Sequence, residues 1–296
     1  MKDSRRLSEL LTRLLKINSE NPPGDERKVA AFTSAFLKKY GLKTKVFSYS
    51  RGRDNVLAVL PGSKPKKDNK PLLITPHLDT VPAGTGWKFK PFAATLRSGK
   101  IYGRGASDCK CNVAVAMEVM ARLAESGFRP QDDVIFLATA DEETGSQKGL
   151  KPFLDKTKIK FAHALILDAD EFDIITAQKG LMHFKVTVKG KRAHGAYPER
   201  GINAIERACS LIGILKDIKL GYKEHALLKP PTINIGTIHG GDKVNMVADW
   251  CEFEVDLRFL PGMSSSMILS EIKKAFKETG FDHKIVISDI QEPYEI

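Results

Sequence analysis

The sequence predicts an α/β protein of two domains, and three features of the chain support this prediction. Its 296 residues are enough for two domains, and 42% of them are hydrophobic, which allows two cores. The first half alternates helical and strand patterns, and its apolar runs at about 134–139 and 164–167 are typical of a sheet covered on both faces. From about Gly180 the strands alternate apolar and polar residues instead, which indicates half-buried strands.

The first domain is predicted at residues 1–179. Asn21-Pro22-Pro23-Gly24 breaks an opening helix, and a second helix begins at Asp25 and stops at Gly41. The opening helix is predicted from five leucines at helical spacing: Leu7, Leu10, Leu11, Leu14 and Leu15. Further strands are expected at 43–49, 55–60 and 72–75. The nearly all-apolar stretch 112–123 predicts a buried helix.

The second domain is predicted at residues 180–291, and residues 292–296 are expected to begin a return to the first domain. Its strands are expected at 181–189, 232–239, 250–259 and 284–288. Its helices are expected at 203–218 and 266–278. The order β-α-β-β-α-β predicts a small α+β, ferredoxin-like domain with helices on one antiparallel sheet.

Composition argues against several classes of partner. No apolar stretch approaches the length of a membrane span, and Met1 is not followed by a signal-type apolar region, so we expect no membrane partner. The net charge of +11 comes from Lys and Arg scattered among Asp and Glu, with one cluster in a predicted loop at 64–70, so we expect no nucleic-acid partner. The cysteines show no disulfide framework or zinc-finger spacing, which predicts a reducing cytoplasm. They are Cys109, Cys111, Cys209 and Cys251.

Acidic residues and one histidine follow four short segments of the first domain. His77 and Asp79 follow the strand at 72–75, and Asp168 follows the strand at 164–167. Asp108 ends a glycine-rich turn, and Glu142 and Glu143 follow the strand at 134–139. Because strand carboxyl ends gather at one edge of an α/β sheet, we expect these side chains to converge. One histidine with several carboxylates is the composition of a hydrolytic metal site.

Each of these residues also has a structural interpretation. His77 alone could be a satisfied structural histidine, and Asp108 could cap the helix that follows it. Asp141-Glu142-Glu143 could be a solvated loop or the start of a helix. The metal-site prediction therefore rests on their joint arrangement at successive strand ends.

Three motifs resemble the signature of a known family. They are His77-Leu78-Asp79-Thr80-Val81-Pro82, Gly103-Arg104-Gly105-Ala106-Ser107-Asp108-Cys109-Lys110 and Asp141-Glu142-Glu143-Thr144-Gly145. The family is that of the dinuclear-zinc deacylases and exopeptidases, which includes acetylornithine deacetylase, succinyl-diaminopimelate desuccinylase, aminoacylase and glutamate carboxypeptidase. The resemblance covers essentially the whole chain. It implies a zinc-exopeptidase-like catalytic domain with a sheet of mixed strands and an inserted lid and dimerisation domain.

The resemblance also implies a ligand set. His77 and Asp168 would bind one metal ion, Asp108 would bridge two ions, and Glu143 would bind the second ion. Zn²⁺ is expected, and Co²⁺ or Mn²⁺ could occupy such a site of nitrogen and oxygen ligands.

Two further residues of this domain receive roles from the resemblance. Asp79 would hydrogen-bond the far nitrogen of His77 and so fix its tautomer and basicity. Glu142 would be the general base, which takes a proton from the attacking water and returns it to the leaving amine.

Three residues of the second domain match family positions near the substrate. His194 would reach the active site of a partner subunit, which implies a homodimer through the lid domain; the alternative is a surface-loop histidine. Asn245 and Arg258 would lie near the acyl or carboxylate end of the substrate, where the guanidinium fork of Arg suits a carboxylate. The alternative for Arg258 is an exposed strand residue paired with Glu254.

The chain departs from the family pattern in two places. Cys109 and Cys111 flank Lys110 where the family has a Lys-Gly-Gly type of sequence, and these thiols could capture metal, respond to redox conditions or simply pack. The resemblance implies a cis peptide bond after Asp108. Family members also continue for about one hundred residues past the lid domain, in keeping with a normal catalytic-domain size.

The family takes its last metal-binding histidine from that further segment, and no histidine of this sequence is an obvious replacement. We therefore expect a second metal site with only Asp108 and Glu143, and apolar surface exposed on the catalytic sheet.

The predicted function is hydrolysis of the amide bond of N-acyl amino acids by a cytoplasmic, metal-dependent amidohydrolase of the deacetylase or desuccinylase type. A dipeptidase or carboxypeptidase of the same family is the first alternative. A catalytically impaired fragment, or a binding and dimerisation protein with an incomplete metal site, is the second.

Overall fold

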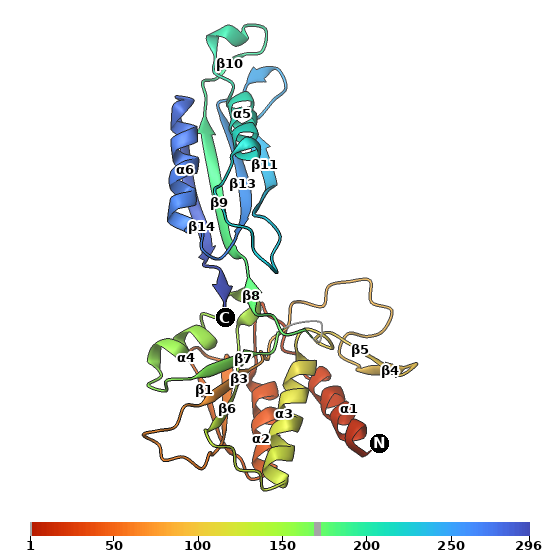
Figure 1. Cartoon of the computed structure of the whole chain (residues 1–296). Coiled ribbons are helices and arrows are strands. Elements are labelled where there is room, and N and C mark those ends of the chain that lie inside the picture. Colours follow the sequence, from red (N-terminus) through yellow and green to blue (C-terminus); the bar gives the residue numbers. More distant parts are fainter. Residues whose placement is uncertain (1, 169–172) are drawn as a thin grey trace. The chain divides into compact units, whose positions relative to one another are not determined.

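A computed structural model describes residues 2–168 and 173–296 and divides the chain into two compact units, Met1–Asp173 and Ile174–Ile296. Figure 1 shows the elements of each unit. The sequence placed the boundary after residue 179 and assigned 292–296 to the first domain. In the structure β8 (Ala177–Gln178) pairs antiparallel with β15 (Tyr294–Glu295), so both segments lie in the second unit.

The first unit is built on a five-stranded mixed sheet of order β1-β2-β6-β3-β7. Strand β2 runs antiparallel to β1 and β6, whereas β6, β3 and β7 are parallel. The strands are β1 (Lys43–Ser48), β2 (Asp54–Leu60), β3 (Leu72–Thr75), β6 (Val134–Ala138) and β7 (His163–Ile166), with a separate hairpin of β4 (Thr95–Arg97) and β5 (Lys100–Tyr102). The helices are α1 (Lys2–Leu15), α2 (Arg27–Lys39), α3 (Lys110–Glu125), the 3-10 turn η1 (Glu142–Thr144) and α4 (Leu150–Lys156).

The sheet of the first unit lies between two layers of helices. Phe136 of β6 belongs to the core that contains Leu14 of α1 and Met117 of α3. The next residue of β6, Leu137, points to the opposite face and joins Phe153 of α4. Because alternate residues of β6 enter two different cores, the strand is apolar at every position, as its sequence predicted.

One prediction of burial in this unit is wrong, and a second is confirmed for only part of a helix. Every residue of β7 is exposed, with Ile166 at 63%, because β7 is the edge strand and pairs only with β3. On α3, Val115 and Val119 are each 43% exposed, since only the opposite stripe of the helix faces the core. Apolar side chains are therefore exposed on β7 and along one stripe of α3.

The second unit confirms the predicted order β-α-β-β-α-β. It has a four-stranded antiparallel sheet of order β11-β13-β9-β14. The elements are β9 (Gly180–Lys189), α5 (Ala204–Asp217), β11 (Thr232–Gly240), β13 (Trp250–Phe259), α6 (Ser265–Glu278) and β14 (His283–Gln291). A short antiparallel pair, β10 (Ala193–His194) and β12 (Met246–Val247), lies outside this sheet, as does the 3-10 turn η2 (Pro198–Arg200).

Both helices of the second unit cover the same face of its sheet. Phe184 of β9 and Phe253 of β13 share a buried cluster with Leu211 of α5 and Ile272 of α6. Asn203 caps α5 by accepting hydrogen bonds from the backbone of its first turn, and Ser264 caps α6 in the same way. No helix among the described residues has the length and apolar character that crossing a membrane requires.

Candidate metal centre

The strand order of the first unit brings the predicted site residues to one edge of the sheet. His77 follows β3, Glu142 follows β6 and Asp168 follows β7. Because these three strands are parallel, their carboxyl ends lie at the same edge. Asp108 reaches this edge from the turn before α3. The sequence-based expectation of convergence is confirmed for His77, Asp108 and Asp168.

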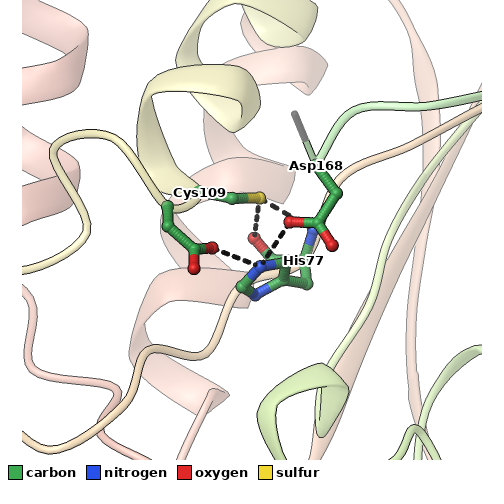
Figure 2. A group of neighbouring side chains, drawn as sticks. His77, Cys109 and Asp168 are labelled. Atoms are coloured by element: carbon green, nitrogen blue, oxygen red, sulfur yellow. Dashed lines mark hydrogen bonds and ion pairs between the residues drawn. The ribbon is translucent and has the colours of Figure 1, made fainter. Parts of the chain in front are cut away.

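His77 is the centre of the cluster. Its ring nitrogen Nε2 lies 2.9 Å from Asp108 Oδ1. The same nitrogen lies 3.2 Å from Asp168 Oδ1, a contact drawn as a dashed line in Figure 2. Its other nitrogen, Nδ1, donates to the backbone carbonyl of Asp79 at 3.0 Å. With the proton held on Nδ1, Nε2 is the nitrogen that can ligate a metal. His77 is only 3% exposed, so its orientation is fixed by its surroundings.

The donor set fits a divalent cation. One ligand atom from each of His77, Asp108, Cys109 and Asp168 lies within 4.8 Å of the others. The carboxylates of Asp108 and Asp168 are 54% and 38% exposed, so a cation could reach them from solvent. An imidazole nitrogen with two carboxylate oxygens suits Zn²⁺, and a thiol adds a softer donor.

Cys109 is the member of this cluster that sequence reasoning did not assign as a ligand. Its thiol is buried, accepts the backbone N–H of His77 at 3.3 Å and lies 3.5 Å from the carbonyl oxygens of His77 and Leu167. Burial raises the pKa of the Cys109 thiol, which favours the protonated form in the absence of a cation. The peptide bond between Asp108 and Cys109 is cis, as the resemblance implied.

The charges in the cluster are strongly coupled. Burial acts to lower the pKa of His77, but hydrogen bonds to Asp108, Asp168 and Asp79 outweigh burial and raise this pKa far above its usual range. The hydrogen bond from His77 in turn lowers the pKa of Asp108. A proton on His77 thus balances the carboxylates, and a bound cation would displace that proton.

Asp79 links His77 to the segment after β6. Its side chain is fully buried and lies 3.4 Å from His77 Nδ1. Its two oxygens accept the backbone N–H groups of Glu142 at 3.1 Å and Glu143 at 3.2 Å. Asn21 Nδ2 donates to the same carboxylate at 2.8 Å. Burial works to raise the pKa of Asp79, but these partners lower it overall, so the carboxylate is ionised.

The two glutamates of η1 differ in their surroundings. Burial raises the pKa of Glu142 to about 7, which suits a group that gains and loses a proton near neutral pH. Burial and the neighbouring Asp108 also raise the pKa of Glu143. Glu143 Oε1 accepts the backbone N–H of Val81 at 3.0 Å, and Glu143 is not among the clustered ligand atoms of the described residues. Its role as the ligand of a second metal remains a prediction.

The predicted substrate residues lie in the second unit. The pairing of β10 with β12 brings His194 and Asn245 together, with the N–H of Gly195 donating to the Asn245 carbonyl at 2.8 Å. His194 and Asn245 are exposed, and His194 Nδ1 accepts the backbone N–H of Ala196. Arg258 forms a two-pronged ion pair with Asp256, at 2.7 and 3.1 Å, and not with Glu254 as the structural alternative supposed.

Two family models match the chain. The model for peptidase family M28 matches residues 55–212, and the model for the peptidase dimerisation domain matches residues 176–284. The acetylornithine deacetylase of Photorhabdus laumondii is 33% identical over 275 residues, which cover 88% of this chain and 68% of the relative. The enzyme of the same name from Vibrio atlanticus is 31% identical over 287 residues, which cover 94% of this chain and 74% of the relative.

The chain belongs to the acetylornithine deacetylase family of metal-dependent amidohydrolases and peptidases. It spans between 55 and 74% of the length of the four acetylornithine deacetylases compared. Family membership confirms the class of enzyme that the three motifs predicted.

Two solved peptidase structures share the fold. The aminopeptidase PepT from Bacillus cereus superposes with a TM-score of 0.77 at 23% identity and covers 99% of this chain and 77% of its own. A metallo-carboxypeptidase of the M20 family from Sulfolobus solfataricus gives a TM-score of 0.73 at 21% identity, covering 96% of this chain and 78% of its own. These likenesses confirm the predicted fold class, a zinc-peptidase α/β unit joined to an α+β unit.

Proposed function

We propose that this chain carries the metal site of a hydrolase that cleaves the amide bond of N-acyl amino acids. The observation that carries the proposal is His77, whose Nε2 faces the carboxylates of both Asp108 and Asp168 while Nδ1 is held by Asp79. The named relatives are acetylornithine deacetylases, so N-acetylornithine is the first substrate to test.

The proposed ligands of the first metal ion are His77, Asp168 and the bridging Asp108, with Zn²⁺ as the preferred ion and Co²⁺ or Mn²⁺ as substitutes. Glu143 and Asp108 are proposed for the second ion. Bound metal would polarise the amide carbonyl and lower the pKa of water at the site.

Glu142 is the proposed general base. It lies in η1 directly after the parallel strand β6, and its backbone N–H is fixed by the buried Asp79. In this position its carboxylate accepts a proton from the attacking water and donates it to the nitrogen of the leaving amine. Asp79 holds the His77 ring and the Glu142 backbone with one carboxylate, which couples the geometry of the ligand to that of the base.

For the second unit we propose a homodimer in which His194 contacts the reacting carbonyl in the active site of the partner subunit. The match of residues 176–284 to a peptidase dimerisation domain supports this proposal. Asn245 and Arg258 are proposed to contact the acyl or carboxylate end of the substrate. The four cysteines are free thiols, which fits the reducing cytoplasm expected from the sequence.

The test is hydrolysis by the purified chain, first stripped of metal and then supplied with Zn²⁺. N-acetylornithine, an N-succinyl amino acid and a dipeptide would be compared by measuring the released amine. We expect Zn²⁺-dependent release from the N-acyl amino acids. If only the dipeptide is cleaved, the chain is a dipeptidase and not a deacylase. If Zn²⁺ binds but no substrate is hydrolysed, the chain is a catalytically impaired fragment or a binding protein with an incomplete metal site.

A further inference from the structure

A group of buried polar side chains is connected to His77 through Asp79 and takes no direct part in the proposed chemistry. Arg53, at the entrance to β2, is 3% exposed, and its partner Glu26, just before α2, is fully buried. Asp141 and Asn21 are also buried. Burying ionised side chains is costly unless they are paired, so the contacts of this group identify what it holds in place.

Arg53 contacts three side chains at once. Its Nε and Nη2 donate to the two carboxylate oxygens of Glu26, each at 2.7 Å. Nη2 also lies 3.1 Å from Asp141 Oδ1, and Nη1 donates to Asn21 Oδ1 at 3.3 Å. The planar guanidinium thereby ties the segment before α2 to the segment after β6.

Two of these contacts lead directly to the proposed site. Asn21 links Arg53 to Asp79, because its Nδ2 donates to the Asp79 carboxylate at 2.8 Å. Asp141 is the residue before Glu142, has a left-handed backbone with φ of 69°, and accepts the hydroxyl of Thr144 at 2.7 Å. Arg53 therefore supports η1 from the Asp79 side and from the Asp141 side.

Gly24 provides the space for the guanidinium. A β-carbon at Gly24 would lie 2.2 Å from Arg53 Nη1 and 2.3 Å from Arg53 Cζ, and the backbone there is left-handed with φ of +79°. Only glycine permits both the close approach and this backbone. Both ends of the Asn21-Pro22-Pro23-Gly24 motif therefore contact Arg53: Asn21 accepts its hydrogen bond, and Gly24 leaves room for its guanidinium.

We propose that Arg53, seated against Gly24, is a positioning residue that sets the His77 ring and the Glu142 backbone through Asn21, Asp79 and Asp141. Part of this inference rests on the proposed function, because the effect on turnover requires the chain to be a hydrolase. The effect on metal affinity requires only that metal binds at the His77 cluster, whether or not the chain is a hydrolase.

The test compares two glycine-to-alanine variants. Gly24→Ala pushes the added methyl group into Arg53, whereas Gly41→Ala introduces alanine at a nearly equal φ of +81° with no atom within 4 Å. The dissociation constant of Co²⁺ would be measured by visible absorption, together with the thermal midpoint. We expect about tenfold weaker Co²⁺ binding in Gly24→Ala, as for loss of a residue that orients a metal ligand, and wild-type binding in Gly41→Ala.

A double variant shows whether the effect passes through Arg53. In an Arg53→Ala background the clash at Gly24 is gone, so adding Gly24→Ala should change Co²⁺ affinity no further. If the chain hydrolyses N-acetyl amino acids, Gly24→Ala should also lower kcat while KM stays near its wild-type value, because Glu142 rather than substrate binding is disturbed.

A lower thermal midpoint in Gly24→Ala with wild-type Co²⁺ affinity would overturn the proposal and leave Arg53 a purely stabilising residue. If Gly24→Ala does not fold, Arg53→Lys keeps the charge beside Glu26 but cannot replace the planar fork. A folded Arg53→Lys chain that binds Co²⁺ like the wild type would overturn the proposal equally. Co²⁺ binding without hydrolysis by the unchanged chain would count against the proposed function alone.

Discussion

The two units bury different kinds of side chain. In the second unit, the buried side chains between the sheet and helices α5 and α6 are apolar, including Phe184, Phe253 and Leu211. Among the described residues, every buried polar or charged side chain belongs to the first unit. They are Ser19, Asn21, Glu26, Thr33, Ser34, Arg53, Asn55, Thr75, His77, Asp79, Thr80, Lys110, Glu118, Thr139 and Asp141.

This difference suggests different roles: the second unit has the interior of a structural scaffold, and the first unit has the interior of a functional site. An apolar core stabilises a fold without requiring particular hydrogen bonds, whereas buried charges lower stability unless each one finds its partner. Several of the buried polar residues of the first unit form a continuous chain of contacts to Glu142: Asp79 accepts its backbone N–H, Asn21 donates to Asp79, and Arg53 donates to Asn21. The first unit therefore keeps a network of buried hydrogen bonds and ion pairs next to the His77 cluster, where apolar side chains would pack without needing such partners.

The largest effect is expected at the proposed general base. Glu142→Gln keeps the size of the side chain but cannot accept a proton, so kcat should fall by about 10²–10⁴-fold while Zn²⁺ content stays the same. Metal content would be measured by elemental analysis beside the turnover rate. Glu224→Gln, in an exposed loop of the second unit, is the control. Loss of Zn²⁺ in Glu142→Gln would make Glu142 a ligand instead of the base.

A core variant of the second unit should separate stability from metal binding. Leu211→Ala opens a cavity in the apolar cluster and should lower the free energy of unfolding of that unit by about 2–5 kcal/mol. Zn²⁺ affinity should not change, because Leu211 belongs to no contact of the metal cluster. Denaturant unfolding and Zn²⁺ titration would be compared with those of Ile205→Ala on the exposed side of α5. A matching loss of Zn²⁺ affinity in Leu211→Ala would remove the distinction between the units.

A pH effect is expected from the buried Glu26. Burial, opposed by Arg53, raises the pKa of Glu26 to about 7 from an ordinary value of 4.5, so the folded chain retains a proton that the unfolded chain has already released. The contribution of Glu26 to stability is thus full below about pH 4.5 and is lost as the pH rises to about 7, by up to about 1.4 kcal/mol per pH unit.

Glu26→Gln should therefore flatten the decline in the free energy of unfolding over this window, measured by urea titration at several pH values. Glu271→Gln, exposed on α6, should keep the wild-type dependence. An identical slope in the Glu26→Gln chain would show that Glu26 stays ionised in the folded state.

The smallest effect on stability is expected at Arg258. Its side chain is 43% exposed and pairs with Asp256 on the open face of the sheet, so Arg258→Gln should change the free energy of unfolding by less than about 1 kcal/mol. If Arg258 binds a substrate carboxylate, KM should rise in the same variant. Both quantities come from one preparation, through chemical unfolding and initial-rate kinetics. A large loss of stability would place Arg258 among the structural residues.

The same contrast explains how much the sequence could predict. The elements of the second unit follow from alternation and helical spacing, because its residues are either apolar and inside or polar and outside. In the first unit, the predicted strand ends identified His77 and Asp168, and the glycine-rich turn identified Asp108. The exposure of β7 could not be predicted, since an apolar run is the same at the edge and in the centre of a sheet.

The burial and pairing of the charged residues next to the site could not be predicted from the sequence either. Glu26 and Arg53 lie 27 positions apart, and charged residues in a sequence are usually exposed. Only the folded chain shows that Gly24 accommodates the guanidinium. The spacing of Cys109 in the sequence likewise does not predict that its thiol lies in the cluster with His77.

We propose that the polar interior of the first unit forms a metal site around His77. Calorimetric titration of the metal-free chain with Zn²⁺ tests it most directly, using His77→Ala and, as a control, His239→Ala in exposed β11. We expect saturable Zn²⁺ binding that disappears in His77→Ala and persists in His239→Ala. Equal Zn²⁺ binding by the wild type and His77→Ala, or none by the wild type, would contradict it.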